Sequence, residues 1–233
     1  MTATNAVSQE RLLRALAEQL KLPLLHIARQ AELAAMTGST SVPNTTITQT
    51  ASMALQLIDG YLLSTDLHAQ QSLHLEPVSI SSVLHDTAQR LQFLARQYNC
   101  EVEIHLAGKY EPVMGHRESL ETAFTMLGYS FIESITEGKD RRLVLAAHRS
   151  GKGLVAGVFG NHPGLTADMY RRARALYGNS RQALPTVSPA SGAGVFIADS
   201  LLAPSGSPLR VARHQKLNGL AATLFPSQQM QLV

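Results

Sequence analysis

The chain has 233 residues, of which 45% are apolar, enough to build one large domain or two small ones. Charged residues make up 16%, the net charge is +3, and the lack of tryptophan argues against an aromatic platform for single-stranded nucleic acid. Its single cysteine, Cys100, allows no intrachain disulfide, which suits a reducing compartment. The sequence has neither a signal peptide nor an apolar run of about 20 residues, so we expect a cytoplasmic protein without a membrane partner.

The first 72 residues carry the pattern of two amphipathic helices. Apolar residues recur every three or four positions over residues 8–36, and Pro23 is expected to bend this helix. Residues 38–43 break the pattern, and a second helix is predicted over residues 44–70. Its apolar stripe comprises Ala51, Leu55, Ile58 and Leu62. Two such helices cannot bury their stripes alone, so residues 8–72 are predicted to form a dimeric four-helix bundle with a second copy.

From residue 76 to residue 230 the pattern alternates between strands and helices. Strands are predicted over residues 78–80, 101–106, 142–147, 153–159, 209–213 and 220–225. Helices are predicted over residues 81–98, 118–133, 166–177 and 194–202, the first capped by Ser81 or Ser82, with a loop over residues 178–189. The predicted fold class is therefore a helical hairpin followed by an α/β sandwich, in which helices cover one face of a mixed sheet.

Residues 17–24 read Ala-Glu-Gln-Leu-Lys-Leu-Pro-Leu. This segment resembles the Ser-His-Glu-Leu-Lys-Thr-Pro-Leu box of bacterial sensor histidine kinases, which implies a dimerisation and phosphoacceptor hairpin over residues 8–72. By this resemblance, Glu18 replaces the phosphoacceptor histidine and Gln19 replaces the adjacent acid. Leu22 replaces the residue that orients water for dephosphorylation. An amide cannot act as a general base at neutral pH, so we expect catalysis at Glu18 and Gln19 to be lost.

The second domain, residues 76–230, resembles the GHKL (Bergerat-like) ATPase domain of the same kinases. The turn Val113-Met-Gly-His116 is similar to the family's Val-x-Gly-Asp turn. On the family's asparagine box, residues 120–130, the two asparagine positions are occupied by Met126 and Ser130.

Two glycine boxes complete the resemblance. The first falls on residues 160–164, where Gly160 replaces the adenine-binding aspartate and Gly164 is kept. The second falls on the segment with Gly192 and Gly194, ahead of a predicted helix. We therefore predict a vestigial nucleotide site.

The resemblance implies magnesium and ATP as cofactors, but the residues present disfavour both. The thioether of Met126 is a poor magnesium ligand, and Gly160 offers no carboxylate to adenine. The backbone donors of Gly192 and Gly194 still suit a phosphate at a helix N-terminus, although a plain tight turn explains the same glycines. The histidines show no metal-ligand spacing, so no metal site is predicted.

These features predict a catalytically deficient pseudokinase of two-component signalling, a dimeric scaffold that binds a response regulator or a histidine kinase. One alternative is a histidine phosphotransferase using His26, which otherwise packs in the bundle, or a residual ATP-dependent histidine kinase. A second alternative is a basic nucleic-acid-associated protein using Arg171, Arg172 and Arg174. Helical spacing and the nearby Asp168 favour a solvated helix face for these arginines, so nucleic acid is not a favoured partner.

Overall fold

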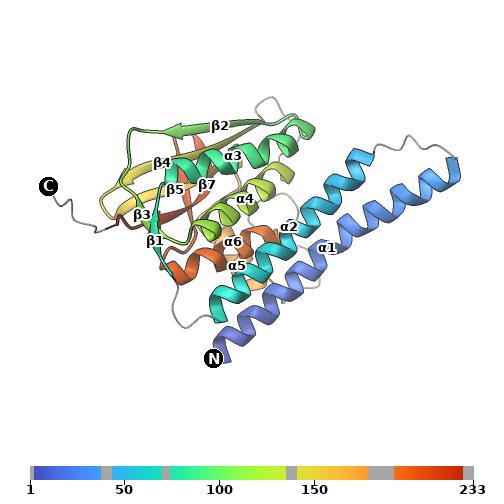
Figure 1. Ribbon diagram of the computed structural model, residues 1–233, viewed down its shortest axis with the longest axis horizontal. Coiled ribbons are helices and arrows are strands. Elements are labelled where there is room, and N and C mark those ends of the chain that lie inside the picture. The colour runs from blue at the N-terminus through green and yellow to red at the C-terminus, as the bar shows by residue number, and fades with distance from the viewer. Residues whose placement is uncertain (1–2, 38–43, 70–73, 135–140, 178–191, 228–233) are drawn as a thin grey trace.

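The computed structural model describes residues 3–37, 44–69, 74–134, 141–177 and 192–227. The hairpin consists of α1 (Ala3–Thr37) and α2 (Asn44–Ala69), which lie side by side along one flank of the second domain (Figure 1). Helix α1 continues through Pro23 as one helix. None of the described helices is both long enough and apolar enough to cross a membrane.

The second domain contains the predicted succession of strands and helices. Its elements are β1 (Glu76–Val78), α3 (Ile80–Gln97), β2 (Glu101–Leu106), β3 (Val113–Gly115), α4 (Arg117–Glu133), β4 (Arg142–Ser150), β5 (Gly153–Gly160), α5 (Ala167–Leu176), α6 (Ala193–Leu202), a short 3-10 turn (Ala203–Ser205), β6 (Arg210–His214) and β7 (Leu217–Leu224). Five strands form a mixed sheet in the order β2-β4-β5-β7-β6, in which only the β2–β4 pair is parallel. The helical hairpin followed by an α/β sandwich, as expected from the sequence, is confirmed.

Three local predictions in the first part of this domain were wrong. Ile80 begins α3 instead of ending a strand, and Ser79, not Ser81 or Ser82, caps the helix by accepting from the backbone of Ser82. The predicted turn around Val113 is a short strand, β3, which pairs antiparallel with β1. Three-residue strands are too short to show a periodic pattern in the sequence. The predicted loop over residues 178–189 lies outside the described residues.

The sheet buries side chains on both of its faces. One face packs under α3, α4 and α6, with Leu145, Val158 and Leu220 fully buried (Figure 1). The opposite face carries a smaller separate core that includes the ring of Phe159. Gly219 makes room for that ring, because a Cβ atom there would lie 2.4 Å from Phe159 Cδ1.

The apolar stripe predicted for α2 is not its buried face. Leu55 and Leu62 are 58% and 52% exposed. The buried face instead consists of Ala54, Leu57, Gly60, Ser64 and Leu67, and it packs against α6 and α4. Gly60 permits this approach, because a Cβ atom there would lie 3.1 Å from Ile197 Cγ2 on α6. The hairpin thus has one apolar face against the second domain and another that faces solvent.

Candidate functional site

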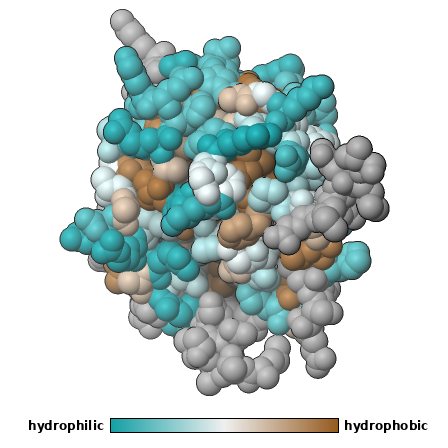
Figure 2. Space-filling model, turned by 90° about the vertical axis from the view of Figure 1, so that its left-hand side faces the viewer, coloured by the Kyte–Doolittle hydropathy of each residue, from teal (hydrophilic) through white to brown (hydrophobic). Residues whose placement is uncertain are grey.

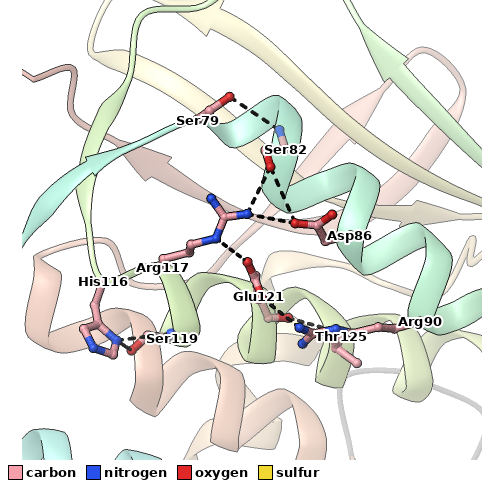
Figure 3. A network of polar contacts seen from close by, with 9 residues as sticks. All are labelled: Ser79, Ser82, Asp86, Arg90, His116, Arg117, Ser119, Glu121 and Thr125. Atoms are coloured by element: carbon pink, nitrogen blue, oxygen red, sulfur yellow. Dashed lines mark hydrogen bonds and ion pairs between the residues drawn. The ribbon is translucent and has the colours of Figure 1, made fainter.

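Helix α4 carries the asparagine-box positions, and a charged network fixes it against α3 (Figure 3). The Glu121 carboxylate, which is 11% exposed, accepts from Arg117 Nε at 2.7 Å and from Arg90 Nη2 at 2.8 Å. Arg117 Nη2 also reaches Asp86 Oδ2 on α3 at 2.8 Å. A nearly buried carboxylate held by two guanidinium groups favours one orientation of α4, because loss of either partner leaves a charge poorly compensated.

His116, which stands at the aspartate position of the resembled turn, is the N-cap residue of α4. Its Nδ1 accepts from the backbone N–H of Ser119 at 3.3 Å and lies 2.8 Å from the hydroxyl of the same residue (Figure 3). This is an N-cap interaction, which satisfies one of the free backbone donors in the first turn of the helix. The departure at His116 therefore preserves the local structure.

The two asparagine-box positions lie in the core. Met126 is 1% exposed and Ser130 is 6% exposed. The Ser130 hydroxyl donates to the backbone oxygen of Met126 at 3.1 Å, so its one proton is used within α4. A Cβ atom placed on Gly60 would lie 3.7 Å from Met126 Cγ, which places the methionine side chain beside α2. The thioether of Met126 is a poor magnesium ligand, and the one side-chain oxygen at these positions, Ser130 Oγ, is buried against the backbone of α4.

Next to Gly160, where the family's adenine-binding aspartate is expected, lies the imidazole of His162. A Cβ atom on Gly160 would lie 3.1 Å from His162 Nε2. The ring is 7% exposed and packs edge-on against Phe131, with centroids 5.0 Å apart. Burial lowers the pKa of His162 to about 4, so the imidazole is neutral at physiological pH. Its buried Nε2 has no partner among the described residues.

At the second glycine box the N-terminus of α6 is capped by a side chain from the hairpin. Oε1 of Gln19 on α1 accepts a hydrogen bond from the backbone N–H of Ala193. Gly192 is the N-cap residue and makes no side-chain cap bond of its own. Gly194 and Ser130 are also close, because a Cβ atom on Gly194 would lie 2.7 Å from Ser130 Oγ. An amide oxygen therefore occupies the position where the resemblance places a phosphate oxygen.

A second contact from α1 lies two turns earlier. Arg11 donates from Nη2 to the backbone oxygen of Ala175 at 2.7 Å and from Nε to that of Tyr177 at 3.2 Å. Its guanidinium lies 4.9 Å from the centroid of the Tyr177 ring, which stacks on Phe196 of α6 at 4.2 Å. Cations near the last carbonyls of a helix are stabilising, and α5 ends here. Arg11 and Gln19 thus join α1 to both α5 and α6.

Helix α6 is also tied to α5 from within the domain. Asp199 accepts from Arg174 at 3.0 Å and from the backbone N–H of Leu209 at 2.9 Å. Burial raises the pKa of Asp199, while Arg174 and the Leu209 bond lower it. Arg171 pairs with Asp168 at 3.3 Å. Two of the three arginines predicted as a basic patch are thus paired with acids: Arg171 on the exposed face of α5, and Arg174 with the largely buried Asp199 of α6.

The remaining predicted residues lie apart from this cluster. His26 is exposed on α1, and Gly164 lies in an open turn, where a Cβ atom would meet no other atom within 4 Å. The backbone of Glu18 and Leu22 is helical, and their side chains lie outside the described part of the chain. Within that part, no group of three or more His, Cys, Asp or Glu residues is arranged to hold a metal ion.

The structure therefore brings Met126, Ser130, Gly192 and Gly194 close together, with Gly160 beside His162 and Gly164 apart from them. Ser130 meets the second glycine box and its neighbour Phe131 meets His162 of the first. From the sequence, His162 is one of several scattered histidines and Gln19 is only a lost base. The closeness of His162 to Gly160 in the sequence is the one signal that points to its position. No pattern in the sequence identifies Arg11 as a residue that contacts the second domain.

The fold is shared with solved histidine kinase structures at low sequence identity. Acinetobacter baumannii histidine kinase AdeS matches with a TM-score of 0.60 at 13% identity, covering 90% of this chain and 98% of that chain. Histidine kinase ThkA in complex with response regulator protein TrrA matches with a TM-score of 0.60 at 10% identity, covering 91% and 60%. Full-length ShkA in complex with AMPPNP matches with a TM-score of 0.54 at 18% identity, covering 97% and 47%. No protein-family model and no curated protein matches the sequence.

Proposed function

We propose that this protein is a catalytically deficient histidine-kinase-like protein of two-component signalling that acts in the cytoplasm as a dimeric binding scaffold. The observation that carries the proposal is that the nucleotide-type site is filled by the chain itself. Gln19 caps the α6 N-terminus and His162 packs beside Gly160. Loss of the chemistry with retention of the frame favours binding over catalysis, because function resides in the site and not in the fold.

A response regulator is the partner that best suits this frame. The similar ThkA structure was solved in complex with the response regulator protein TrrA, and the match covers 91% of this chain. The surface that we assign to such a partner is the hairpin, where Leu24 and Leu25 are 59% and 65% exposed beside the exposed His26. Exposed leucines flanked by a polar side chain suit a docking surface.

The second apolar face of the hairpin supports a homodimer. Leu13, Leu55 and Leu62 are each about half exposed. By contrast, the end of the molecule at the left of Figure 1 is mainly hydrophilic, with small and separate apolar areas (Figure 2). Light scattering should give a dimer for the natural sequence and a monomer for a Leu55→Glu, Leu62→Glu variant. A dimer that survives both substitutions would contradict this interface.

Phosphoryl transfer separates the scaffold from its enzymatic alternative. His26 is exposed, which favours a phosphotransferase as the second candidate, since an exposed imidazole can meet a phosphorylated receiver. Incubation with labelled ATP or with a phosphorylated receiver domain should leave the protein unlabelled. Acid-labile label that disappears in a His26→Ala variant would establish the phosphotransferase and reject the scaffold proposal. A His85→Ala variant, also exposed, is the matched control.

A further inference from the structure

A cluster of histidines lies on the face of the sheet opposite α3, α4 and α6. The small core on this face consists of Val144, Ala146, Val155, Phe159, Leu217 and Ala221. The His214 ring lies beside this core, with its centroid 5.4 Å from that of Phe159. His148 stacks near His214 at 6.3 Å. The imidazole rings of His148 and His214 thus border an apolar core. This core lies on the face of the sheet that faces solvent in an ordinary two-layer sandwich.

The cluster joins the two edges of the sheet. In the order β2-β4-β5-β7-β6, strands β2 and β6 stand at opposite ends with three strands between them. Even so, Nδ1 of His105 on β2 lies 3.0 Å from Nε2 of His214 on β6. Sheets coil because their strands twist, and here the coiling brings the edges within reach of two side chains. The imidazole pair links strands that share no ladder of backbone hydrogen bonds.

The hydrogen bonds define which protons the pair can hold. His105 Nε2 lies 2.9 Å from Glu103 Oε2, and a carboxylate can only accept, so this nitrogen carries a proton. In a neutral His105 the other nitrogen, Nδ1, then accepts from His214 Nε2–H. One added proton is tolerated, because a charged His105 can donate to a neutral His214. A second proton places two N–H groups face to face and removes the bond.

The surroundings oppose that second proton. Burial, then the nearby His105 and His148, lower the pKa of His214. Across the cluster, β2 supplies Glu103 and β4 supplies Arg142, which lie 3.6 Å apart. The facing residue of β5 is the uncharged Phe159, β7 has no ionisable side chain, and Lys216 in the β6–β7 turn is exposed. The other charged side chains of these strands, Glu101 on β2, Arg149 on β4 and Arg210 and Arg213 on β6, are exposed, and Glu103 is shared between His105 and Arg142.

We propose that His105 and His214 form an acid-sensitive clasp that holds the two edges of the sheet together and releases them when both imidazoles are charged. Release frees β6, an edge strand bonded only to β7, and uncovers the small core beneath. The clasp is independent of the proposed scaffold function, since it lies on the opposite face of the sheet from α6 and Gln19. It makes the folded state of this domain responsive to mild acid.

The test is a comparison of urea unfolding at pH 7.5 and pH 5 for the natural sequence and a His214→Gln variant. Glutamine places an N–H donor near the Nε2 position but does not titrate, so the link to His105 is kept. A depressed pKa means that stability is present above the ordinary histidine value and is lost as pH falls below it. The unfolding constant should therefore rise by a larger factor between the two pH values in the natural sequence than in the His214→Gln variant.

Two further measurements keep this test decisive. The pH dependence of unfolding that His162 contributes is present in both proteins, so it cancels in the comparison. As a control, a His26→Gln variant should show the same pH dependence of unfolding as the natural sequence. An NMR titration should give His214 a midpoint below that of an exposed histidine, with faster amide exchange in β6 once it is charged. Equal pH dependence of unfolding in the natural and His214→Gln proteins, or an ordinary midpoint for His214, would overturn the proposal.

Discussion

The two ends of the proposed vestigial nucleotide site are closed in different ways. At the first glycine box the closing group, His162, comes from the same domain and is 7% exposed. At the second, the closing group is Gln19 from the hairpin, which is only half-buried and reaches a helix 174 residues away in the sequence. The first end is closed by core packing and cannot open without local unfolding. The second is closed by a docked helix, so hairpin movement can open it.

The largest effect on stability is expected when acid protonates His162 at the first end of the site. The pKa of His162 is about 4 in the folded protein against an ordinary value of 6.5. The unfolded chain therefore binds the proton first, and stability is lost as pH falls from about 6.5 to about 4, in total on the order of 3 kcal/mol. Urea unfolding of a His162→Leu variant should lack this loss. An unchanged pH dependence would show that His162 is not held neutral by burial.

A larger side chain at Gly194, in the second end of the site, should lower the free energy of unfolding by less than acid does at His162. A Cβ atom on Gly194 would lie 2.7 Å from Ser130 Oγ and 3.0 Å from the backbone oxygen of Met126. Gly194→Ala should therefore destabilise by about 1–3 kcal/mol, the usual cost of overpacking. Gly164→Ala, which meets no atom within 4 Å, is the control and should be near neutral. A Ser130→Gly substitution should recover part of the loss, and strict additivity of the two would argue against this contact.

Removing the cap should have a smaller effect, confined to one helix end. Gln19→Ala should cost about 0.5–2 kcal/mol, as loss of other N-caps does. Hydrogen exchange at the Ala193 amide should become faster, while amides in the middle of α6 keep their protection. Gln30→Ala on the same helix is the matched control. Equal exchange at Ala193 in both variants would show that Gln19 does not hold the α6 N-terminus.

The weakest effect is expected at the outer contact of the hairpin. Arg11→Ala removes two hydrogen bonds to the end of α5 and should cost about 1 kcal/mol. Arg14→Ala removes a surface pair with Glu10 at 3.7 Å, in which both side chains are more than 60% exposed, and should cost less than about 0.5 kcal/mol. Thermal unfolding of the two variants measures the difference. Equal losses of stability in the two variants would show that Arg11 does not stabilise the contact between the hairpin and the second domain.

The sequence allowed the order and type of the long elements to be predicted, because their apolar periodicity is strong. It led to the wrong face of α2, since the exposed face carries Leu55 and Leu62 and the buried face carries the equally apolar Leu57 and Leu67. The buried face relies on Gly60 and Ser64, whose small size lets α6 approach and whose hydropathy gives no hint of burial. A helix face that is buried because its small side chains let another helix approach closely is hard to recognise from hydrophobicity alone.

The sequence motifs named Met126, Ser130, Gly192 and Gly194, and in the structure Ser130 lies beside the other three. The motifs did not show how this region is closed. That a glutamine from α1 would cap α6 depends on how the hairpin docks, which no local pattern encodes. The same holds for the pairing of His105 with His214, because the coiling of a five-stranded sheet sets that distance.

Nucleotide binding measured by calorimetry in the presence of magnesium tests the central claim most directly. We expect no heat of binding for ATP with the natural sequence, because Gln19 and His162 fill the two ends of the site and Met126 cannot ligate magnesium. A Gln19→Ala, His162→Ala variant should also lack magnesium-dependent binding, since no asparagine or aspartate is restored. Saturable, magnesium-dependent ATP binding by the natural sequence would contradict the account of a self-filled, catalytically deficient site.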